Sequence, residues 1–240
     1  MRVAVLRFPG TWSETDFAHA LSLVGADADI LWHADADLRG YDAAVVPGGF
    51  AYGDYLRAGA IAAISPAADE LRRADREGMP ILGSCNGFQI LCEIGLLPGA
   101  LVRNRHGEFR CDWVHLRIES DRTPFTGGLR GAVVRMPIAH GEGCYFADDA
   151  TLDELERDGR VLFRYVREDG ARAGVDHDAA NPNGSLRAIA GVLNARGNVA
   201  GLMPHPERCS EELLGGTDGR RVLEALTASR HTGMVSGSVQ

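Results

Sequence analysis

The sequence predicts an α/β fold, specifically a flavodoxin-like three-layer sandwich with a mostly parallel central sheet. Short apolar runs alternate with helical patterns through the first third of the chain, which is the order of βαβ units. Two of these runs end in glycine-rich loops, at residues 47–49 and 83–87, and ligands of parallel sheets bind beyond such strand ends. Residues 101–136 instead alternate apolar and polar side chains, which predicts added antiparallel strands with one solvated face.

In the first half of the chain, residues 13–16 resemble a capping box, so a helix should begin there and end at Gly25. Residues 57–77 also have a helical pattern, which is broken near Pro66 because proline is tolerated only near a helix start. The strands expected in this half cover residues 3–8, 28–32, 43–46 and the apolar run that Pro80 opens.

In the second half, residues 137–143 are dense in glycine and ionisable groups, and we expect a loop. Residues 161–166 and the turn at Asp169-Gly170 predict one arm of a hairpin, and Asn-Pro-Asn-Gly-Ser at 181–185 predicts a turn. No linker or repeat divides the chain, so we expect one domain over residues 1–229 and a flexible tail over residues 230–240. Further strands are expected at 114–118, 132–138, 189–193 and 199–203, and a last helix at 219–228.

The composition excludes several kinds of function. The 240-residue chain has a net charge of -8 and no long cluster of basic residues, which argues against a nucleic-acid partner. No apolar run approaches the ~18–20 residues that cross a bilayer, so no membrane association is expected. The five cysteines form no Cys-x-x-Cys pair and no signal peptide is visible, which favours reduced thiols in the cytoplasm. The eight histidines lack ligand spacing, so no metal site is expected.

The strongest catalytic candidate is Cys85, at the centre of the sequence Gly-Ser-Cys-Asn-Gly. A buried strand runs directly into a helix there, as in a nucleophile elbow, with a thiol in place of a hydroxyl. Glycines at 83 and 87 are expected because side chains on either side of so sharp a turn would collide. The elbow also lies at a helix N-terminus, which favours thiolate over thiol.

A cysteine nucleophile needs a base, and the base needs an acceptor that fixes its tautomer. His205 and Glu207 follow another predicted strand end. In an extended chain, residues two apart point the same way, so we expect the Glu207 carboxylate to contact the His205 ring. Acyl transfer also needs an oxyanion hole, for which the backbone N–H groups of Asn86 and Gly49 are the candidates. Gln89, one turn into the helix, is either a substrate contact or an ordinary surface glutamine.

These residues together resemble a known family. Residues 83–89 and the His-Pro-Glu at 205–207 are similar to the triad class, class I, of glutamine amidotransferase domains. Four further stretches are similar to the glutaminase subunits of phosphoribosylformylglycinamidine synthases, and the likeness extends from Met1 to about residue 229. These stretches are Phe-Pro-Gly at 8–10, residues 47–59, residues 137–143 and residues 181–185.

The resemblance implies a mechanism and partners. It implies that Cys85 forms a thioester with L-glutamine, that His205 and Glu207 complete the triad, and that ammonia passes to a separate synthetase subunit. That subunit would use ATP and Mg²⁺ to convert formylglycinamide ribonucleotide to the amidine in purine biosynthesis, with a small third subunit bridging the two. This chain lacks a Gly-x-x-x-x-Gly-Lys-[Ser/Thr] loop, so no cofactor is expected on it.

The same resemblance directs attention to residues around the nucleophile. We expect Gln89, Gly48, Phe50 and His140 to contact the substrate, and residues 50–59 with the 137–143 loop to contact the partner or line the exit of ammonia. The chain departs from the family pattern at two places. Thr-Trp-Ser at 11–13 replaces the Ser-Asn-Cys usual after Phe-Pro-Gly, and Cys144 replaces a polar or basic residue.

Three other functions stay open on the residues alone. A stand-alone cysteine hydrolase, or a chaperone-like protein with the same elbow, would be active without a partner and would not prefer glutamine. A non-catalytic, flavodoxin-like binding module would have a Cys85 that resists alkylation at neutral pH. An amidotransferase subunit of another pathway would share the triad and differ in its partner.

Overall fold

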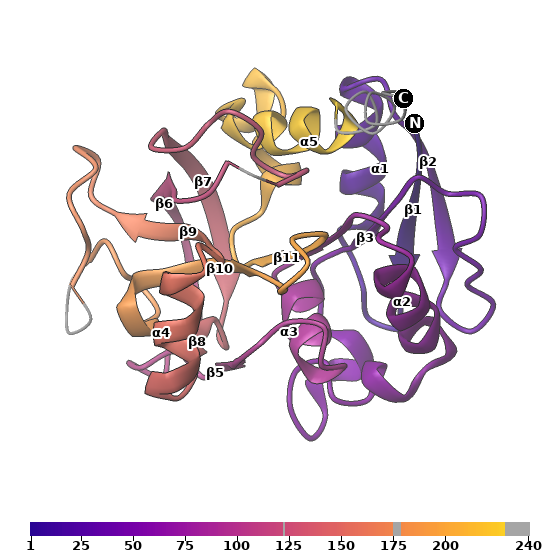
Figure 1. Cartoon of the computed structure of the whole chain (residues 1–240), viewed down its shortest axis with the longest axis horizontal. Helices are drawn as coiled ribbons and strands as arrows, with labels where there is room; N and C mark the ends of the chain where they lie inside the picture. The colour runs from indigo at the N-terminus through magenta and orange to yellow at the C-terminus, as the bar shows by residue number, and fades with distance from the viewer. Residues whose placement is uncertain (122, 175–178, 229–240) are drawn as a thin grey trace, which may run out of the picture.

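The computed structural model describes residues 1–121, 123–174 and 179–228 (Figure 1). The expected flexible tail at 230–240 lies outside these residues. The strands are β1 (Arg2–Arg7), β2 (Asp27–Trp32), β3 (Ala43–Val46), β4 (Ile81–Ser84), β5 (Ala100–Val102), β6 (Arg110–Ile118), β7 (Val133–His140), β8 (Cys144–Phe146), β9 (Val161–Val166), β10 (Ile189–Leu193) and β11 (Val199–Leu202). The α-helices are α1 (Glu14–Leu23), α2 (Pro66–Arg76), α3 (Asn86–Glu93), α4 (Asp149–Arg157) and α5 (Asp218–Ala228). Short 3-10 helices are η1 (Ala51–Asp54), η2 (Ala62–Ile64), η3 (Leu186–Ala188), η4 (Pro206–Cys209) and η5 (Glu212–Leu214).

Nine strands form the central sheet in the order β2-β1-β3-β4-β11-β10-β9-β6-β7. The pairs from β2 to β11 are parallel, whereas β10, β9, β6 and β7 are each added antiparallel. Strands β6 and β7 alternate buried and half-buried positions along much of their length, as expected for strands with one face less covered than the other. The predicted fold class, with its parallel strands and antiparallel additions, is therefore confirmed.

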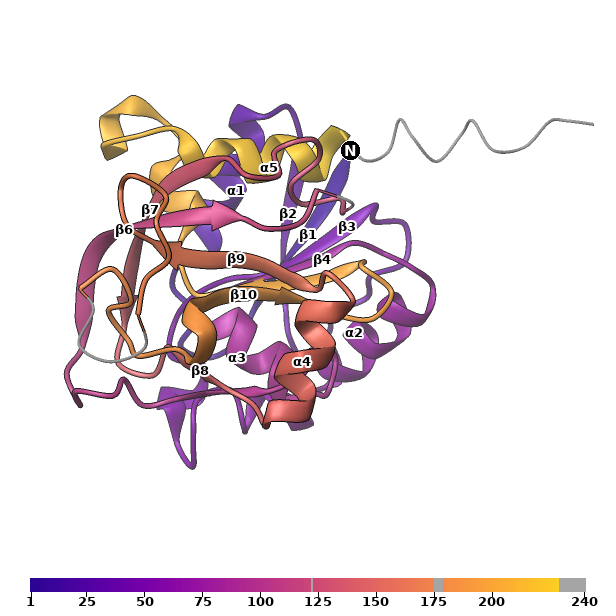
Figure 2. The ribbon, with the colours of Figure 1, turned by 60° about the vertical axis from the view of Figure 1, so that its left-hand side comes forward.

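Helices cover both faces of the sheet, which makes three layers (Figure 2). One core joins the apolar faces of α1 and α5 to side chains of β1 and β3 that include Val3, Val5 and Val45. The other core joins α2, α3 and α4 to the opposite side chains of the same strands, such as Ala4 and Leu6. The central parallel strands are buried on both faces, which explains their continuous apolar runs.

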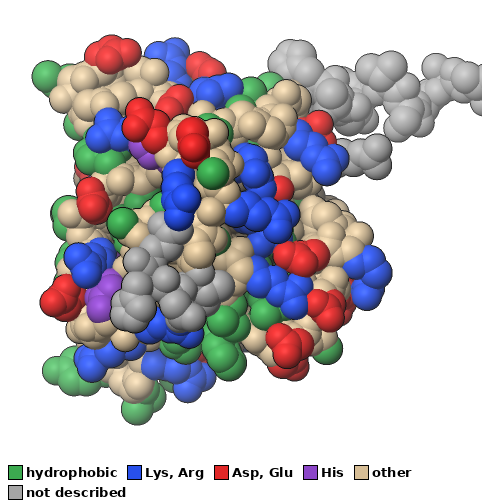
Figure 3. Space-filling model, turned by 90° about the vertical axis from the view of Figure 1, so that its left-hand side faces the viewer, with side chains coloured by type: hydrophobic (Ala, Val, Ile, Leu, Met, Phe, Trp, Pro, Cys, Tyr) green, Lys and Arg blue, Asp and Glu red, His purple; other side chains and the backbone are tan. Residues whose placement is uncertain are grey.

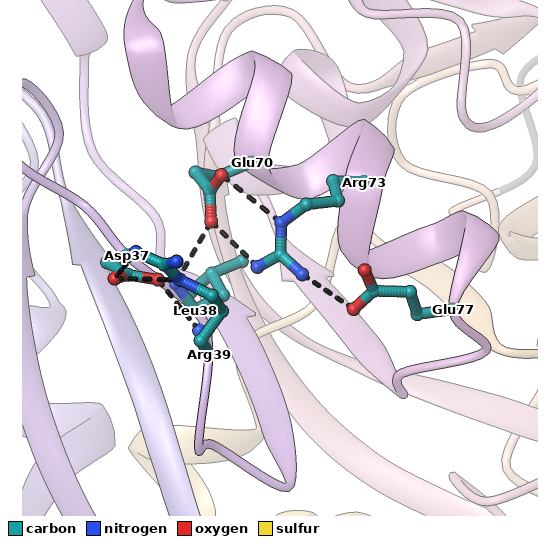
Figure 4. A network of polar contacts seen from close by, with 6 residues as sticks. All are labelled: Asp37, Leu38, Arg39, Glu70, Arg73 and Glu77. Carbon is teal, nitrogen blue, oxygen red and sulfur yellow. Dashed lines mark hydrogen bonds and ion pairs between the residues drawn. The ribbon is translucent and has the colours of Figure 1, made fainter.

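A polar network fixes helix α2 against the loop that follows β2 (Figure 4). The carboxylate of Glu70 accepts a 3.1 Å hydrogen bond from the backbone N–H of Leu38 and a 2.8 Å bond from Arg73. Arg73 also donates to Glu77, one turn further along the helix, at 2.6 Å. These pairs have the i,i+3 and i,i+4 spacing that suits a helix surface.

Two expectations for the first half were wrong in detail. The side chain of Ser13 does not cap α1; its hydroxyl accepts a 2.9 Å hydrogen bond from the backbone N–H of Gly48. The helix expected over residues 57–77 begins only at Pro66. Residues 57–61 form turns and η2 follows, because the proline that opens α2 also ends the helical pattern before it.

Expectations for the second half also need correction. The loop expected at 137–143 is shorter, since β7 continues to His140 and only residues 141–143 connect it to β8. The turn at Asp169-Gly170 is present, but the second arm is reduced to one bridge between Val166 and Arg172, and β9 pairs instead with β10 and β6. Helix α4 was not predicted, although Asp148 caps it through a 2.8 Å bond from the N–H of Thr151.

On the face drawn in Figure 3, Lys and Arg side chains gather near the middle of the face, and Asp and Glu side chains lie on both sides of them. Among the described residues, no helix has both the length and the apolar character needed to cross a membrane. The five cysteines are all free thiols.

Candidate active site

Cys85 lies at a sharp turn between β4 and α3. Its backbone has φ 51° and ψ -109°, a strained conformation for a residue with a side chain. The backbone N–H of Cys85 donates a 2.8 Å hydrogen bond to the carbonyl of Leu202, the last residue of β11. The predicted elbow geometry is thus present, and the neighbouring strand holds it in place.

The two glycines of the elbow have different neighbours. A Cβ atom at Gly83 would lie 2.8 Å from the backbone of Gly87, as expected for a turn this sharp. A Cβ atom at Gly87 would lie 1.8 Å from the carbonyl oxygen of Val46. The second glycine is therefore required by the close approach of α3 to β3, and not by its partner across the turn.

His205 and Glu207 form a buried ion pair just beyond β11. Nδ1 of His205 lies 2.6 Å from Oε1 of Glu207, and both residues are 1 % exposed. The contact is as predicted, but the backbone is not extended, because Pro206 begins the 3-10 helix η4. The N–H of His205 donates to the carbonyl of Pro137 at 2.9 Å, so β7 also positions the ring.

The charges around His205 favour its protonated form. Burial alone would lower its pKa, but the negative charge of Glu207 and the interaction with Cys85 outweigh burial and raise the pKa to about 9. The Cys85 sulfur lies 3.8 Å from the carbonyl oxygen of Ala139. Within the described part of the chain, Nε2 of His205 has no hydrogen-bond partner, which leaves this atom available for proton transfer.

The segment that contains Gly49 forms the wall opposite the elbow. It is bridged to the loop after β1, since the N–H of Phe50 donates to Gly10 at 2.9 Å and the N–H of Trp12 donates to Gly48 at 3.3 Å. Gly49 has φ 154°, and a Cβ atom there would lie 2.6 Å from the carbonyl oxygen of Gly10. Only glycine fits this position, and its N–H makes no hydrogen bond to the described residues.

A chain of amide side chains links the walls of the site. Oδ1 of Asn86 accepts from the N–H of Ala51 at 3.0 Å, and its Nδ2 donates to Oε1 of Gln89 at 2.9 Å. Nε2 of Gln89 in turn donates to the backbone carbonyl of Glu142 at 2.7 Å. Gln89 is 6 % exposed, so it is no ordinary surface glutamine, and its amide connects the elbow helix to the loop at 141–143.

A pocket of about 280 Å³ opens above Cys85. Of the predicted site residues, Gly49, Phe50, Gln89 and His140 line it together with the nucleophile. Gly48 lies behind the lining, where a Cβ atom would be 2.8 Å from the His205 ring, so its contact with substrate stays a prediction. The lining residues that were not predicted as substrate contacts are Asp54, Arg103, Gly107, Phe109, Ala139, Gly141 and Glu142.

His140 is a second buried histidine of the pocket, and it is held neutral. Burial, and then the nearby His205, lower its pKa to about 3. Nδ2 of Asn183 lies 3.2 Å from Nε2 of His140. The same Nδ2 also donates to the carbonyl of Gly143 at 2.7 Å and lies 3.0 Å from the Tyr165 hydroxyl, so the amide of Asn183 connects His140 to the loop at 141–143 and to β9.

The two departures from the family pattern also have a place in the structure. The indole of Trp12 lies under the guanidinium of Arg208, 4.6 Å from ring centre to Cζ. Ser13 bonds Gly48, as described above. Cys144 is buried, and its thiol donates to the carbonyl of Gly184 at 3.2 Å. None of these side chains lines the pocket. Among the described residues, no three His, Cys, Asp or Glu side chains are grouped as metal ligands would be.

Comparison with known proteins agrees with this geometry. The sequence pattern of the CobB/CobQ-like glutamine amidotransferase domain matches residues 1–217. The chain belongs to this family. Within it, the chain is 53% identical over 228 residues to the phosphoribosylformylglycinamidine synthase subunit PurQ of Methanosarcina acetivorans, covering 94% of this chain and 97% of that protein. It is 52% identical to PurQ of Moorella thermoacetica, covering 94% and 95%. It is thus a member of the PurQ group of glutamine amidotransferases.

Solved structures also share the fold. A chain of the PurLQS structure from Thermotoga maritima has a TM-score of 0.82 and 44% identity, covering 95% of this chain and 97% of that one. A glutamine amidotransferase from Thermotoga maritima, at 19% identity and a TM-score of 0.52, covers 96% and 91% and shares the fold alone. The resemblance inferred from the elbow and the His-Pro-Glu sequence is therefore confirmed at the level of the family.

Proposed function

We propose that this PurQ-family chain is the glutaminase subunit of a phosphoribosylformylglycinamidine synthase, which hydrolyses L-glutamine through a Cys85 thioester. The observation that carries the proposal is the buried pair of His205 and Glu207, 2.6 Å apart, next to a strained cysteine elbow. Names of relatives that match nearly the whole chain support the choice of pathway.

In the first half-reaction, the Cys85 thiolate adds to the carbonyl carbon of the glutamine side-chain amide, and the electron pair moves to oxygen. In this proposal, the backbone N–H groups of Asn86 and Gly49 donate hydrogen bonds to that oxygen and stabilise its negative charge. When the tetrahedral intermediate collapses, the C–N bond breaks and protonated His205 gives its Nε2 proton to the leaving nitrogen, which departs as ammonia. The raised pKa of His205 supports this starting state.

In the second half-reaction, neutral His205 takes a proton from water, and the oxygen adds to the glutamyl thioester. The C–S bond then breaks, glutamate leaves, and the thiolate and imidazolium are restored. The carboxylate of Glu207 holds Nδ1 protonated throughout, so that Nε2 is the nitrogen that exchanges the proton. The sum is glutamine plus water to glutamate plus ammonia.

The ammonia would pass to a synthetase subunit that binds ATP and Mg²⁺, with a small bridging subunit, to form formylglycinamidine ribonucleotide. The loop over residues 50–59 supports a partner at the pocket mouth. Phe50 lines the pocket and is 46% exposed, while Tyr55 and Leu56 are 74% and 91% exposed. We also propose the cytoplasm as the location, since all five cysteines are free thiols.

The test is glutamine hydrolysis by the wild-type chain and by Cys85→Ala, each with and without the synthetase and small subunits. We expect Cys85→Ala to abolish the release of glutamate and ammonia, and intact mass spectrometry after acid quench to show a glutamyl adduct only on wild type. Cys111→Ala, which changes an exposed cysteine outside the pocket, is the matched control. Ammonia release that survives Cys85→Ala would overturn the mechanism.

A further inference from the structure

Trp12 lies outside the pocket, and the mechanism above gives it no role. It is 54% exposed, on the loop that follows β1. Its indole nevertheless has a specific neighbour, since the guanidinium of Arg208 on η4 lies over it, 4.6 Å from ring centre to Cζ. A cation at this distance from an indole face is attracted to the ring. The contact joins two segments that lie far apart in the sequence, and each segment carries a different part of the site.

The Trp12 end of this contact belongs to the wall that contains Gly49. The backbone N–H of Trp12 donates to the carbonyl of Gly48 at 3.3 Å, and Thr11 forms an antiparallel bridge with Gly49. A Cβ atom at Gly49 would lie 2.7 Å from Cα of Thr11 and 3.1 Å from the nitrogen of Trp12. The peptide of Gly49 therefore packs directly on residues 11 and 12, and a shift of Trp12 would shift the oxyanion wall.

The Arg208 end of the contact belongs to the segment of the base. Arg208 follows Glu207 on η4, and its backbone N–H donates to the carbonyl of His205 at 3.3 Å. Its Nε lies 4.0 Å from Oε1 of Glu207, the same oxygen that contacts Nδ1 of His205. The side chain of Glu207 is fully buried, whereas that of Arg208 is 22% exposed. The guanidinium thus extends from the triad carboxylate to the indole at the surface.

The sheet alone does not fix the wall relative to the base. Gly49 follows β3 and His205 follows β11, and β4 lies between these two strands. Inside the site, the two parts meet where Gly48 lies against the His205 ring, since a Cβ atom at Gly48 would be 2.8 Å from Cε1 of that ring. A glycine offers the ring little contact surface, so the contact between Trp12 and Arg208 is a second link, on the solvent side.

The proposed reaction requires the wall and the base to be aligned at the same moment. In the tetrahedral intermediate, the oxyanion and the leaving nitrogen are bonded to one carbon. The oxyanion must reach the N–H of Gly49 while the nitrogen reaches Nε2 of His205, so the separation of these two groups affects the rate. Binding of the substrate in its ground state makes no such demand, because neither the negative charge nor the proton transfer has developed.

We propose that Trp12 is a positioning residue for catalysis, whose indole, in contact with the Arg208 guanidinium, holds the oxyanion wall in place relative to His205 and Glu207. This inference rests on the proposed glutaminase function and goes beyond it, because it assigns a role to a side chain outside the pocket. It also gives a function to one of the residues by which this chain departs from the family pattern.

The test separates the π face of Trp12 from its bulk. Trp12→Leu keeps an apolar side chain and removes the π face, whereas Trp12→Phe preserves a smaller aromatic ring. Arg208→Gln removes the cation, and Arg208→Lys preserves it. For each variant, kcat and KM for glutamine are measured in the complex with saturating synthetase and small subunits, and Tm is measured on the chain by itself.

Trp12→Leu should lower kcat and kcat/KM together by about three- to tenfold and leave KM nearly unchanged, since the lost alignment matters only in the transition state. Trp12→Phe should restore most of the rate. Arg208→Gln should also lower kcat, in part because its charge near Glu207 is lost, and Arg208→Lys should be milder. The double variant Trp12→Leu/Arg208→Gln should be no slower than Arg208→Gln, because the contact is already absent.

Arg2 and Tyr41 form the matched control pair. The Arg2 guanidinium also lies 4.6 Å from the ring centre, and neither residue lines the pocket. Arg2 begins β1, at the end of the strand opposite to the loop that contains Trp12. Arg2→Gln and Tyr41→Leu should change Tm at most and leave kcat as in the wild type.

An unchanged kcat in Trp12→Leu, or a change in KM alone, would overturn the proposal. So would losses that multiply in the double variant, because the two side chains would then act independently. The assay of Cys85→Ala separates this inference from the proposed function. Hydrolysis that depends on Cys85 but not on Trp12 removes the inference and leaves the proposed function standing. The lack of any hydrolysis that depends on Cys85 removes both.

Discussion

Nδ1 of His205 lies 2.6 Å from Oε1 of Glu207 in a site that solvent does not reach. Burial opposes the imidazolium, and the carboxylate is what reverses that effect. Glu207 therefore sets both the tautomer and the charge of His205. Removal of its carboxylate should change the pKa of His205 as well as the turnover rate.

Glu207→Gln should lower the turnover of glutamine by about two to four orders of magnitude, as loss of the orienting carboxylate does in other triads. It should also lower the pKa of His205, because burial would then act unopposed. The pH titration of the ring, followed by NMR, checks the second effect. An unchanged titration would show that Glu207 does not control the base.

Gly87→Ala should destabilise the fold strongly. The added Cβ would lie 1.8 Å from the carbonyl of Val46, and neither α3 nor β3 can move without disturbing the sheet. We expect a loss of about 3 kcal/mol or more in the free energy of unfolding, at or beyond the upper end for overpacking. Urea unfolding measures it, and Gly127→Ala, where a Cβ meets nothing within 4 Å, should cost little.

Asp54→Asn should stabilise the protein at neutral pH. The pKa of Asp54 is raised to about 6, so between its ordinary value and 6 the folded chain binds more protons than the unfolded chain. Stability of the wild type therefore falls as pH rises through this window, and the variant should escape that fall. The Tm difference should be largest near pH 8 and vanish below about pH 4. A difference that does not depend on pH would contradict the raised pKa.

Ser13→Ala should weaken the wall that contains Gly49. The Ser13 hydroxyl accepts a hydrogen bond from the N–H of Gly48, and alanine would leave this buried donor unpaired. The expected cost is about 1–3 kcal/mol in unfolding free energy, with a lower turnover number because the oxyanion wall loses support. Ser22→Ala, on the exposed part of α1, is the control. Equal effects of the two substitutions would argue against a special role of Ser13.

The loop at residues 50–59 offers a test of partner binding that leaves the pocket intact. Charge reversal at Asp54 would disturb the hydrogen bond from Asn86, so Leu56→Glu is the cleaner change, since this side chain is 91% exposed. We expect a weaker complex with the synthetase subunit, measured by analytical ultracentrifugation. Leu213→Glu, at a site 92% exposed on η5, is the matched control. If only the control weakens the complex, the partner binds the other surface. Charge reversal of Arg57 is a less suitable test than Leu56→Glu, because it would also break the ion pair between Arg57 and Glu93.

The sequence was most informative where one local pattern has one structural outcome. The elbow at Cys85 and the run of parallel strands follow from glycine spacing and apolar runs, and both are present in the structure. Helix α4 could have been read from the cap at Asp148 and from Leu152 and Leu155 three residues apart, both buried against the core. The start of α2 at Pro66 was harder to predict, because the alanine-rich residues before this proline are compatible with both a helix and turns.

The charged part of the pocket could not be predicted from the sequence. Arg103 and Glu142 are brought together by the pairing of β5 with β8, two strands of three residues each that carry no periodic signal. The contact of His205 with Glu207 was predicted for the wrong backbone, because a 3-10 turn and an extended chain can both bring the two side chains together.

The backbone N–H of Cys85 donates to the carbonyl of Leu202 at the end of β11, and this hydrogen bond joins the nucleophile to the strand that leads to the base. His205 is three residues beyond Leu202, whose carbonyl holds the elbow. The Gly49 wall depends on a different strand, β3, and on its bridge to the loop after β1. The nucleophile and the base therefore follow two neighbouring strands, β4 and β11, whereas Gly49 follows β3, the neighbour of β4 on its other side, so β4 is the strand through which both halves of the site are held in register.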